Sequence, residues 1–286
     1  MAQAWQRDES SCIGLGEAGA FDDMHLFAPC VAYENGTYSL WYSGSQNTVA
    51  DRVFTLGLAT SNDGIHFAKH DRTPVCGFTG GRSILTPTLL RHADGSLCRE
   101  EGRLCLWFSS CDFPSGNPRH TLHETASDDG ITWDTPSDEQ LEHAHAPTLI
   151  KEDDRYKLWF TDVRQEPWCF RYAESDDGYN WEFPELGLYE LDGLTANNAL
   201  FGSDYFMIHS LFRDPTAEPP ERYKAIERQK GDEILFGAVS PDGLRWTRKE
   251  EPLLVVGKPL DTQNIAAFDE DTGEYLAFLR GGYERR

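Results

Sequence analysis

The segment Ala126-Ser-Asp-Asp-Gly-Ile-Thr-Trp133 decides the fold, because the chain contains it four times in related form. The shared pattern is Ser-x-Asp-Gly-x-x-aromatic, and the copies lie 48 to 66 residues apart. Their serines are Ser61, Ser127, Ser175 and Ser240. This spacing suits one four-stranded sheet with its loops per repeat. The repeats therefore predict an all-β fold, a β-propeller.

The chemistry of this motif predicts a structural role. Asp-Gly is a favoured centre of tight turns, because glycine tolerates a positive φ. The serine and aspartate side chains can bind the amides of the turn. The aromatic residue then begins the next strand and can pack between neighbouring sheets. We expect the motif to hold turns and not to catalyse.

A second repeated pattern precedes each copy of the motif. It consists of an apolar strand, a polar turn and an alternating strand that ends in aromatic residues. Its clearest copies are residues 28–42, 86–108 and 146–160. We expect these to be the inner two strands of the first three blades. Trp41, Trp107 and Trp159 recur at the same place in them, which predicts packing between blades.

The last two blades are less regular. We expect the fourth to begin near Asn197 and the fifth at Asp261, but no copy of the motif follows Arg280. Trp5-Gln-Arg resembles the end of the motif, so we expect an N-terminal strand to close the last blade. Closure would hide exposed strand edges. The sequence thus predicts one five-bladed β-propeller domain over residues 1–286.

Composition excludes several partners. The chain has 286 residues, 39% of them hydrophobic, and a net charge of −22. Such a polyanion repels nucleic acid and anionic lipid, so neither is expected as a partner. The seven cysteines are irregularly spaced, without a C-x-x-C pair, and the N-terminus lacks a signal-like apolar run. We therefore expect a cytoplasmic protein with free thiols and no metal or cofactor.

Several segments resemble a known group of enzymes. They are Phe21-Asp-Asp, Ala28-Pro-Cys-Val, Tyr38-Ser-Leu-Trp-Tyr-Ser-Gly44, Gly57-Leu-Ala-Thr-Ser-Asn-Asp-Gly64, Glu221-Arg-Tyr-Lys-Ala-Ile and Asp261-Thr-Gln-Asn. Together they are similar to five-bladed glycosidase-like propellers, the relatives of glycoside hydrolase families 32, 43, 68 and 130. The resemblance covers nearly the whole chain. It implies the five-bladed fold and cleavage of glycosidic bonds by carboxylates.

The chain departs from that group at the catalytic positions. The group typically carries one acid on each of the first three blades. The matching positions are Ala28, Leu85-Thr86-Pro87 and His145. The catalytic triad therefore cannot be transferred to this sequence, and candidate acids must be sought elsewhere.

The starts of the inner strands converge at one mouth of a propeller channel, which is the default binding site. Glycoside cleavage needs two carboxyl groups with different roles. We expect Asp23 to be the base or nucleophile and Glu142 the acid, with Asp162 in reserve. Asp261 is expected to tune either acid, because like charges raise a neighbour's pKa.

Further polar and aromatic residues lie near the expected strand starts and ends. The expected substrate-binding residues are Asp22, Arg82, His145, Arg164, Trp168, Asn197, Asn198, Gln263 and Arg280. Trp168 departs from the repeat and is a candidate for stacking on a sugar. His143 and His145 alternate, but one histidine pair does not predict a metal site.

The sequence favours a glycoside hydrolase-like enzyme that cleaves a small glycoside or oligosaccharide with paired carboxylates at the channel mouth. The alternative is a non-catalytic, carbohydrate-binding propeller that has lost the acids of the group. Two carboxyl groups within catalytic distance would favour the enzyme. A mouth lined by asparagine, histidine and tryptophan would favour the binding protein.

Overall fold

The fold is all-β. The computed structural model describes residues 5, 10–164, 168–202, 206–229, 234–255, 260, 263–269 and 272–279. Apart from a short 3-10 turn, η1 (Pro219–Glu221), the regular elements of this part are strands. None of its helical segments is long and apolar enough to cross a membrane.

The first two sheets follow the predicted repeats. Blade one has four strands in the order β1-β2-β3-β4, and blade two has five, with β10-β9-β8-β5 in order and β7 beside β8. Their bounds are β1 (His25–Glu34), β2 (Thr37–Ser45), β3 (Thr55–Ser61), β4 (Ala68–Lys69), β5 (Leu85–Leu89), β7 (Arg99–Glu100), β8 (Arg103–Asp112), β9 (Asn117–Ser127) and β10 (Leu141–Glu142).

The later sheets complete the described structure. Blade three has the order β14-β13-β12-β11-β6, blade four has β15-β16-β17-β18, and the last sheet has two strands. Their bounds are β6 (Arg91–His92), β11 (Ala144–Glu152), β12 (Arg155–Asp162), β13 (Cys169–Ser175), β14 (Ala199–Gly202), β15 (Phe206–Arg213), β16 (Tyr223–Gln229), β17 (Ile234–Ser240), β18 (Thr247–Val255), β19 (Ile265–Asp269) and β20 (Glu274–Phe278).

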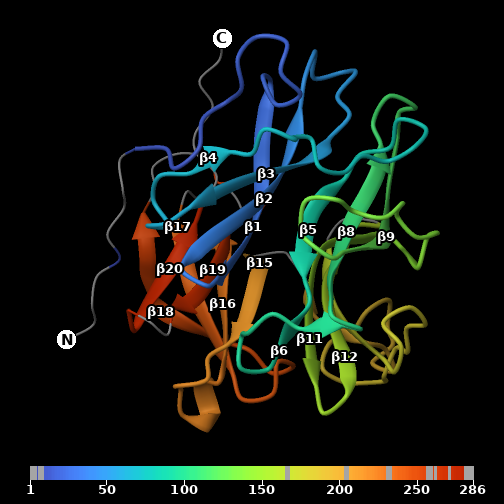
Figure 1. The fold of residues 1–286 in the computed structure, drawn as a ribbon. Coiled ribbons are helices and arrows are strands. Elements are labelled where there is room, and N and C mark those ends of the chain that lie inside the picture. The colour runs from blue at the N-terminus through green and yellow to red at the C-terminus, as the bar shows by residue number, and fades with distance from the viewer. Residues whose placement is uncertain are drawn as a thin grey trace.

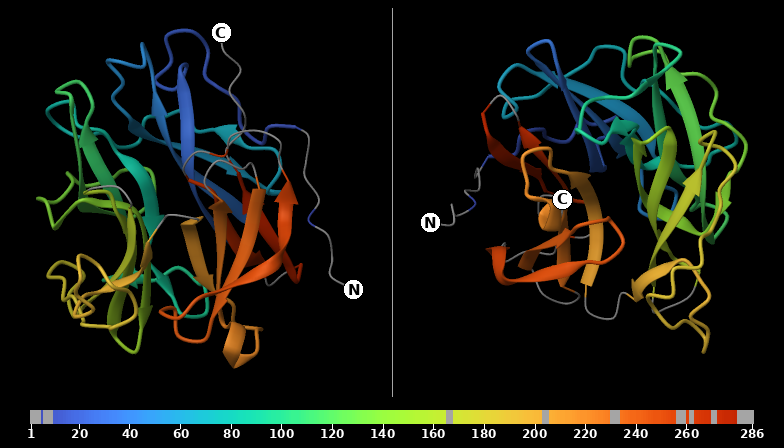
Figure 2. Two further views of the ribbon diagram at one scale, coloured as in Figure 1. Left: turned by 180° about the vertical axis from the view of Figure 1, so that it is seen from behind. Right: turned by 90° about the horizontal axis from the view of Figure 1, so that it is seen from below.

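The sheets are arranged as in a propeller. They follow one another around a central axis in chain order, which the view from below displays (Figures 1 and 2). A strand of each sheet lines the cavity at the centre: β1, β5, β11, β15 and β19. This confirms the prediction that residues 28–42 and the matching segments of blades two and three form inner strands.

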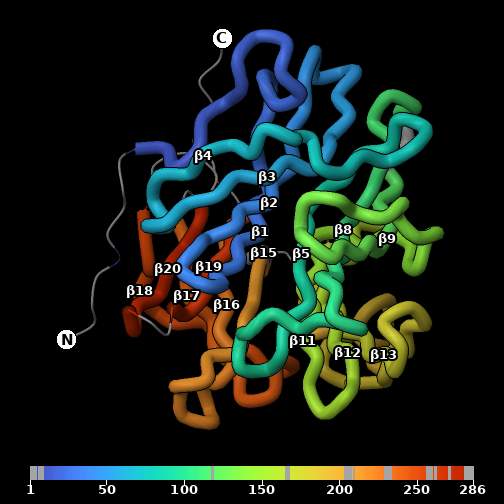
Figure 3. The backbone as a smooth tube through the Cα atoms, viewed as in Figure 1, coloured from blue at the N-terminus to red at the C-terminus, as the bar shows by residue number. Residues whose placement is uncertain are grey.

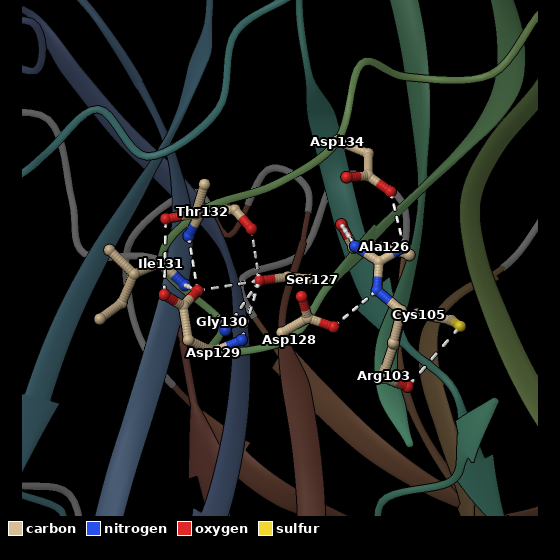
Figure 4. Close-up of polar contacts among 10 residues, drawn as sticks. All are labelled: Arg103, Cys105, Ala126, Ser127, Asp128, Asp129, Gly130, Ile131, Thr132 and Asp134. Atoms are coloured by element: carbon tan, nitrogen blue, oxygen red, sulfur yellow. Dashed lines mark hydrogen bonds and ion pairs between the residues drawn. The ribbon is translucent and has the colours of Figure 1, made fainter. Parts of the chain in front are cut away.

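The repeated motif closes the third strand of each blade. Ser127 is the last residue of β9, and its hydroxyl accepts a hydrogen bond from the Gly130 amide at 2.8 Å (Figure 4). Asp129 Oδ1 accepts bonds from the amides of Ile131 and Thr132 at 2.8 and 2.7 Å. The other three copies make the same bonds. The predicted structural role is confirmed.

The tryptophans join each blade to the turn of the next. Trp41 Nε1 of blade one donates to the Gly130 carbonyl of blade two at 2.9 Å. Trp107 donates to Gly178 of blade three at 3.3 Å, and Trp159 to Gly243 of blade four at 2.7 Å. All three indoles are almost completely buried. The two repeated patterns of the sequence are therefore the two halves of one contact between blades.

One expectation about the later blades is wrong, and the predicted fifth blade is seen only as a two-stranded sheet. Asn197 and Asn198 precede β14, which is the outer strand of blade three, and the first strand of blade four is β15. Four sheets have four or five strands, but the last has only two. The described residues therefore form four complete blades and not the five that were expected.

Closure of the last blade by an N-terminal strand is not seen. Residues 1–4 and 6–9 lie outside the described part, and no strand is present between Ser10 and Met24. Figure 3 follows this segment, in dark blue, past β4 of blade one. The Cys12 carbonyl accepts a hydrogen bond from the Phe67 amide at 3.1 Å, next to β4. The described N-terminal segment therefore packs on blade one.

Gly130 gives a test of the contact between blades. Its φ of +73° is unfavourable for other residues, and a Cβ there would lie 2.9 Å from Trp41 Cζ2. We expect Gly130→Ala to lower the free energy of unfolding by about 3 kcal/mol, the sum of backbone strain and overpacking. Gly102→Ala is the control, because Gly102 has a φ of +84° and open space around it.

The control carries only the backbone cost, about 1 kcal/mol. Urea unfolding of both variants measures the difference. Equal losses in the two variants would show that the turn does not pack against Trp41 in solution.

Candidate functional site

The centre of the propeller is hollow. A cavity of about 420 Å³ lies on the axis, and its lining includes residues of β1, β5, β11, β15 and β19. Apolar and hydroxyl side chains such as Leu89, Thr148 and Ser210 contribute to it. A concave site of this size can accommodate a small ligand. Of the described candidate residues, only Gln263 lines this cavity.

One loop crosses the lower end of this channel, where the inner strands end. It follows β5 of blade two and contains β6, which pairs with β11 of blade three. Arg91 donates to the Val31 carbonyl of blade one, and Arg213 of blade four donates to the Ala93 carbonyl at 3.1 Å. The loop thus contacts three blades beyond its own. The sequence predicts the candidate site at the opposite end, the mouth, where the inner strands begin.

The inner strands share an irregularity near the mouth. In blades one to three a residue before proline has a left-handed conformation, with φ of 55° at Ala28, 48° at Thr86 and 49° at Ala146. The strand pairing shifts at each of these places, and it shifts again in blade four between Ile208 and Ser210. Bulges of this kind redirect the side chains beyond them. They separate the strand starts at the mouth from the regular ladder below.

Asp22 and Asp23 of blade one have different surroundings. Asp22 is buried, and its Oδ2 accepts hydrogen bonds from Tyr42 at 2.9 Å and Lys69 at 2.5 Å. Burial, and then the charge of Asp22, raise the pKa of Tyr42. Asp23 accepts a bond from the Gly19 amide at 2.7 Å in an exposed turn. Asp22 is therefore committed to the packing of blade one, and Asp23 to a turn.

Glu142 lies away from the channel. It is on β10, the outer strand of blade two, and its side chain is 54% exposed. It pairs with Arg119, and its Oε2 lies 3.6 Å from His143 Nε2. The structure does not bring Glu142 together with Asp23.

Asp162 is a buried acid at the mouth. It ends β12, and its Oδ2 lies 2.9 Å from Arg171 Nε. Its Oδ1 accepts a bond from the Arg164 amide at 3.0 Å, and Arg164 Nη2 lies 3.9 Å from Oδ2. Arg171 also donates to Asn198 Oδ1 at 2.7 Å. Asp162, Arg164 and Asn198 of the predicted set thus form one polar cluster.

Asn197 serves the connection to β14. Its side-chain Nδ2 donates to the carbonyls of Tyr189 and Leu194 at 3.0 and 2.7 Å, and its Oδ1 accepts a bond from the Ala199 amide. Asn198 Nδ2 donates to the Tyr172 carbonyl at 2.8 Å. Both asparagines are therefore structural residues at the outer edge of blade three.

A second polar cluster joins blades two and three. The rings of His120 and His145 meet edge to face, with centroids 4.7 Å apart. Burial lowers the pKa of His120 to about 3, and the nearby His145, Arg82 and His143 act in the same direction. Arg82 donates to Thr121 Oγ1 at 2.7 Å, next to His120 in the chain. His120 is therefore a neutral imidazole at neutral pH.

Gln263 and Trp168 are the remaining described candidates. Gln263 lines the channel cavity and is 2% exposed, and its Oε1 has no hydrogen-bond partner in the described part of the chain. Trp168 is half-buried just before β13. Asp261 and Arg280 lie outside the described residues.

Sequence reasoning missed Glu227. It follows Ile226 on β16, and Tyr42, Phe108 and Phe160 occupy the same position in the other blades, as the strand registers indicate. Glu227 is 1% exposed, and its Oε1 lies 2.8 Å from Arg248 Nε. Burial raises the pKa of Glu227 to about 7, and Arg248 opposes this. Aligning the four repeats would have revealed an acid at an aromatic position.

The donor groups do not suggest a metal. In the described ranges, no three histidine, cysteine, aspartate or glutamate side chains are placed to hold an ion. The seven cysteines are free thiols. The candidate polar groups are therefore a buried carboxylate, guanidinium groups and histidines, of which His120 is neutral.

Comparison with known proteins supports the fold. No protein-family model and no curated protein sequence matches the chain. A solved glycoside hydrolase superposes with a TM-score of 0.66 and 11% identity, covering 91% of this chain and 89% of the other. An N-acetylgalactosamine deacetylase from F. plautii gives 0.58 and 16%, covering 85% and 73%.

A third structure widens the chemistry of these neighbours. It is a glycoside hydrolase of the GH130 family of mannoside phosphorylases, which targets β-1,2 mannosidic linkages in Candida mannan. It gives a TM-score of 0.54 and 17% identity, covering 81% of this chain and 72% of the other. Since these proteins catalyse different reactions, the similarity establishes the propeller-like fold and leaves the activity to the site.

Asp22 and Asp23 offer a matched test of structural roles. Asp22→Asn breaks a buried pair with the partly exposed Lys69, so we expect the free energy of unfolding to fall by about 2 kcal/mol. Asp23→Asn changes an exposed turn and should cost about 0.5 kcal/mol or less. Urea unfolding at pH 7 measures both, and a larger loss for Asp23→Asn would contradict the assignment.

Glu227 predicts a pH effect on stability. Its pKa is raised from 4.5 to about 7 on folding, so the folded state binds more protons than the unfolded state between these values. Stability from this group is therefore present below pH 4.5 and is lost as the pH rises through 7. Glu227→Gln cannot titrate.

The stability of Glu227→Gln relative to the wild type should therefore increase from pH 4.5 to pH 8, whatever the constant effect of losing the Arg248 pair. Urea unfolding across this range measures the slope. A constant difference would mean that the pKa of Glu227 is not raised.

Proposed function

We propose that this chain is a glycoside hydrolase-like enzyme that acts on a small glycoside or oligosaccharide at the mouth of the propeller channel. The observation that carries the proposal is Asp162, a buried carboxylate at the mouth that is held by Arg171 and by the Arg164 amide. A carboxylate fixed in this way suits a base or nucleophile in glycoside cleavage. The glycoside hydrolases among the structural neighbours make this chemistry plausible for the fold.

The proposed fold completes the ring with a fifth blade. β19 lines the channel beside the four other inner strands, which supports this. Phe278 of β20 meets Phe67 of blade one edge to face at 6.0 Å, and Trp41 meets Trp133 in the same way at 6.2 Å. The last sheet thus contacts blade one as the complete blades contact each other. An N-terminal strand remains our proposal for its outer part.

Three acids are candidates for the second catalytic carboxyl group. Asp23 and Glu142 are exposed and engaged in local contacts, which weakens both as catalytic groups. Asp261 precedes Gln263 by two residues in the sequence, and Gln263 lines the channel. We therefore propose Asp261 as the partner of Asp162. Arg82, His145, Arg164, Trp168, Gln263 and Arg280 remain proposed substrate-binding residues.

The alternative function is carbohydrate binding without catalysis. The positions of Asp23 and Glu142 outside the channel favour it, since an enzyme needs two carboxyl groups across the bond that breaks. Binding of an oligosaccharide without cleavage of any member of a glycoside library would support this alternative.

Asp162→Asn distinguishes the two functions. For a substrate found in a library of aryl glycosides and oligosaccharides, we expect turnover to fall at least about 100-fold, as for loss of a catalytic acid or base. Because Asp162→Asn also breaks the buried pair with Arg171, we expect its Tm to fall, and turnover is measured at a temperature where circular dichroism shows the variant to be folded. Asp128→Asn, in an exposed turn, is the control and should leave turnover unchanged.

Product analysis by chromatography measures turnover, and calorimetry measures binding. If Asp162→Asn keeps full turnover, Asp162 is not catalytic. If the wild type binds oligosaccharides but cleaves none, the enzyme proposal fails and the binding alternative stands.

A further inference from the structure

Two arginines at the channel mouth differ from most others in the chain. With a net charge of −22, carboxylates are abundant, and arginines such as Arg99, Arg103 and Arg155 each pair with at least one. Arg52 and Arg82 are half-buried, and the described residues place no carboxylate in an ion pair with either. Arg72 and Arg91 also bind neutral acceptors without a described ion pair, but Arg52 and Arg82 differ from them in lying together at the mouth.

Neutral groups hold Arg82 in place. Its Nε donates to Ser110 Oγ at 3.1 Å, and its Nη2 donates to Thr121 Oγ1 at 2.7 Å and to the Ser110 carbonyl at 3.4 Å. Thr121 Oγ1 in turn lies 2.8 Å from His123 Nε2, and His123 Nδ1 lies 2.9 Å from the Ser137 carbonyl. This series of hydrogen bonds orients the guanidinium and does not neutralise its charge. Nη1 makes no hydrogen bond to the described residues.

Arg52 lies in the same corner of the mouth, between blades one and two. Its guanidinium carbon is 3.9 Å from the centre of the Phe113 ring, at the mouth end of the β8–β9 hairpin. The segments that carry the two arginines are joined, because the Phe54 amide donates to Ser83 Oγ and the Ile84 amide to the Phe54 carbonyl.

Both arginines act on the same buried thiol, that of Cys111. Burial raises the pKa of the Cys111 thiol to about 12; Arg52 and Arg82 both act to lower it, and Asp112 acts to raise it. The nearest acids are engaged in turns: Asp112 accepts from the Ser115 amide at 3.1 Å, and Asp51 from Thr48 Oγ1 at 2.9 Å. Neither acid forms an ion pair with Arg52 or Arg82 among the described residues, because both carboxylates are turned toward these local donors.

We propose that Arg52 and Arg82 form an oxyanion subsite at the channel mouth. A guanidinium binds carboxylate or phosphate oxygens through charge-assisted hydrogen bonds. The subsite takes either the carboxylate of an acidic sugar in the substrate or free phosphate as a second reactant. The assignment to the substrate rests on the proposed function; binding of the anion does not.

Equilibrium binding tests the subsite without turnover. Calorimetry in low-salt buffer compares glucuronate, glucose and inorganic phosphate on the full chain. We expect an anion to bind and glucose to bind at least about tenfold more weakly, because a charged hydrogen bond contributes more than a neutral one. Arg82→Gln should weaken the anion about tenfold or more, and Arg52→Gln less.

Arg72→Gln is the matched control. It removes the same charge from an exposed arginine that donates to Thr132 Oγ1 of the neighbouring blade at 2.9 Å, away from Arg52 and Arg82. Anion affinity should be unchanged in this variant. Circular dichroism and Tm confirm that each variant is folded.

The outcomes separate the two sources and the two proposals. Binding of glucuronate that depends on Arg82 assigns the subsite to an acidic sugar, and binding of phosphate alone assigns it to a second reactant. Arg82-dependent binding without cleavage of any glycoside would leave the subsite standing while the enzyme proposal fails. Equal binding of glucose and both anions, or equal losses in Arg82→Gln and Arg72→Gln, would overturn the subsite.

Discussion

The indole hydrogen bond from one blade to the glycine carbonyl of the next is the constraint on which the structure depends. Trp41, Trp107 and Trp159 each donate into the turn that the Ser-x-Asp-Gly motif builds. The turn must hold its glycine carbonyl toward the indole, and the serine and aspartate bonds fix that orientation. The hydrogen bond thereby joins the turn of one blade to a strand of the preceding blade, and this contact constrains the angle between the two sheets.

This dependence explains how much of the fold could be predicted. The motif and the tryptophans are determined by short-range hydrogen bonding and recur in the sequence, so the blades they define were found. Asn197 and Asn198 were assigned to an inner strand because a short apolar run follows them, yet outer strands have the same pattern. Asp261 and Arg280 fall outside the described residues and remain predictions from the sequence.

The site was harder to predict, because closeness to a strand in the sequence is not closeness to the channel. Asp23 and Glu142 precede inner strands, but a turn holds one and an outer strand carries the other. Asp162 was correctly placed at a strand end, although its partner Arg171 comes from another strand. His120 and Arg52 lie on a third strand and in a loop, where no repeat marks them.

The directional order of the tryptophan contacts also bears on how the chain folds. Each contact joins blades that are consecutive in the chain, so the ring can grow by adding one neighbour at a time. The contact of Phe67 with Phe278 differs, because it joins the two ends of the ring across most of the sequence and uses no tryptophan. Loop-closure entropy weighs most heavily on that seam. We therefore expect the junction of the first and last sheets to form last on folding and to open first on unfolding.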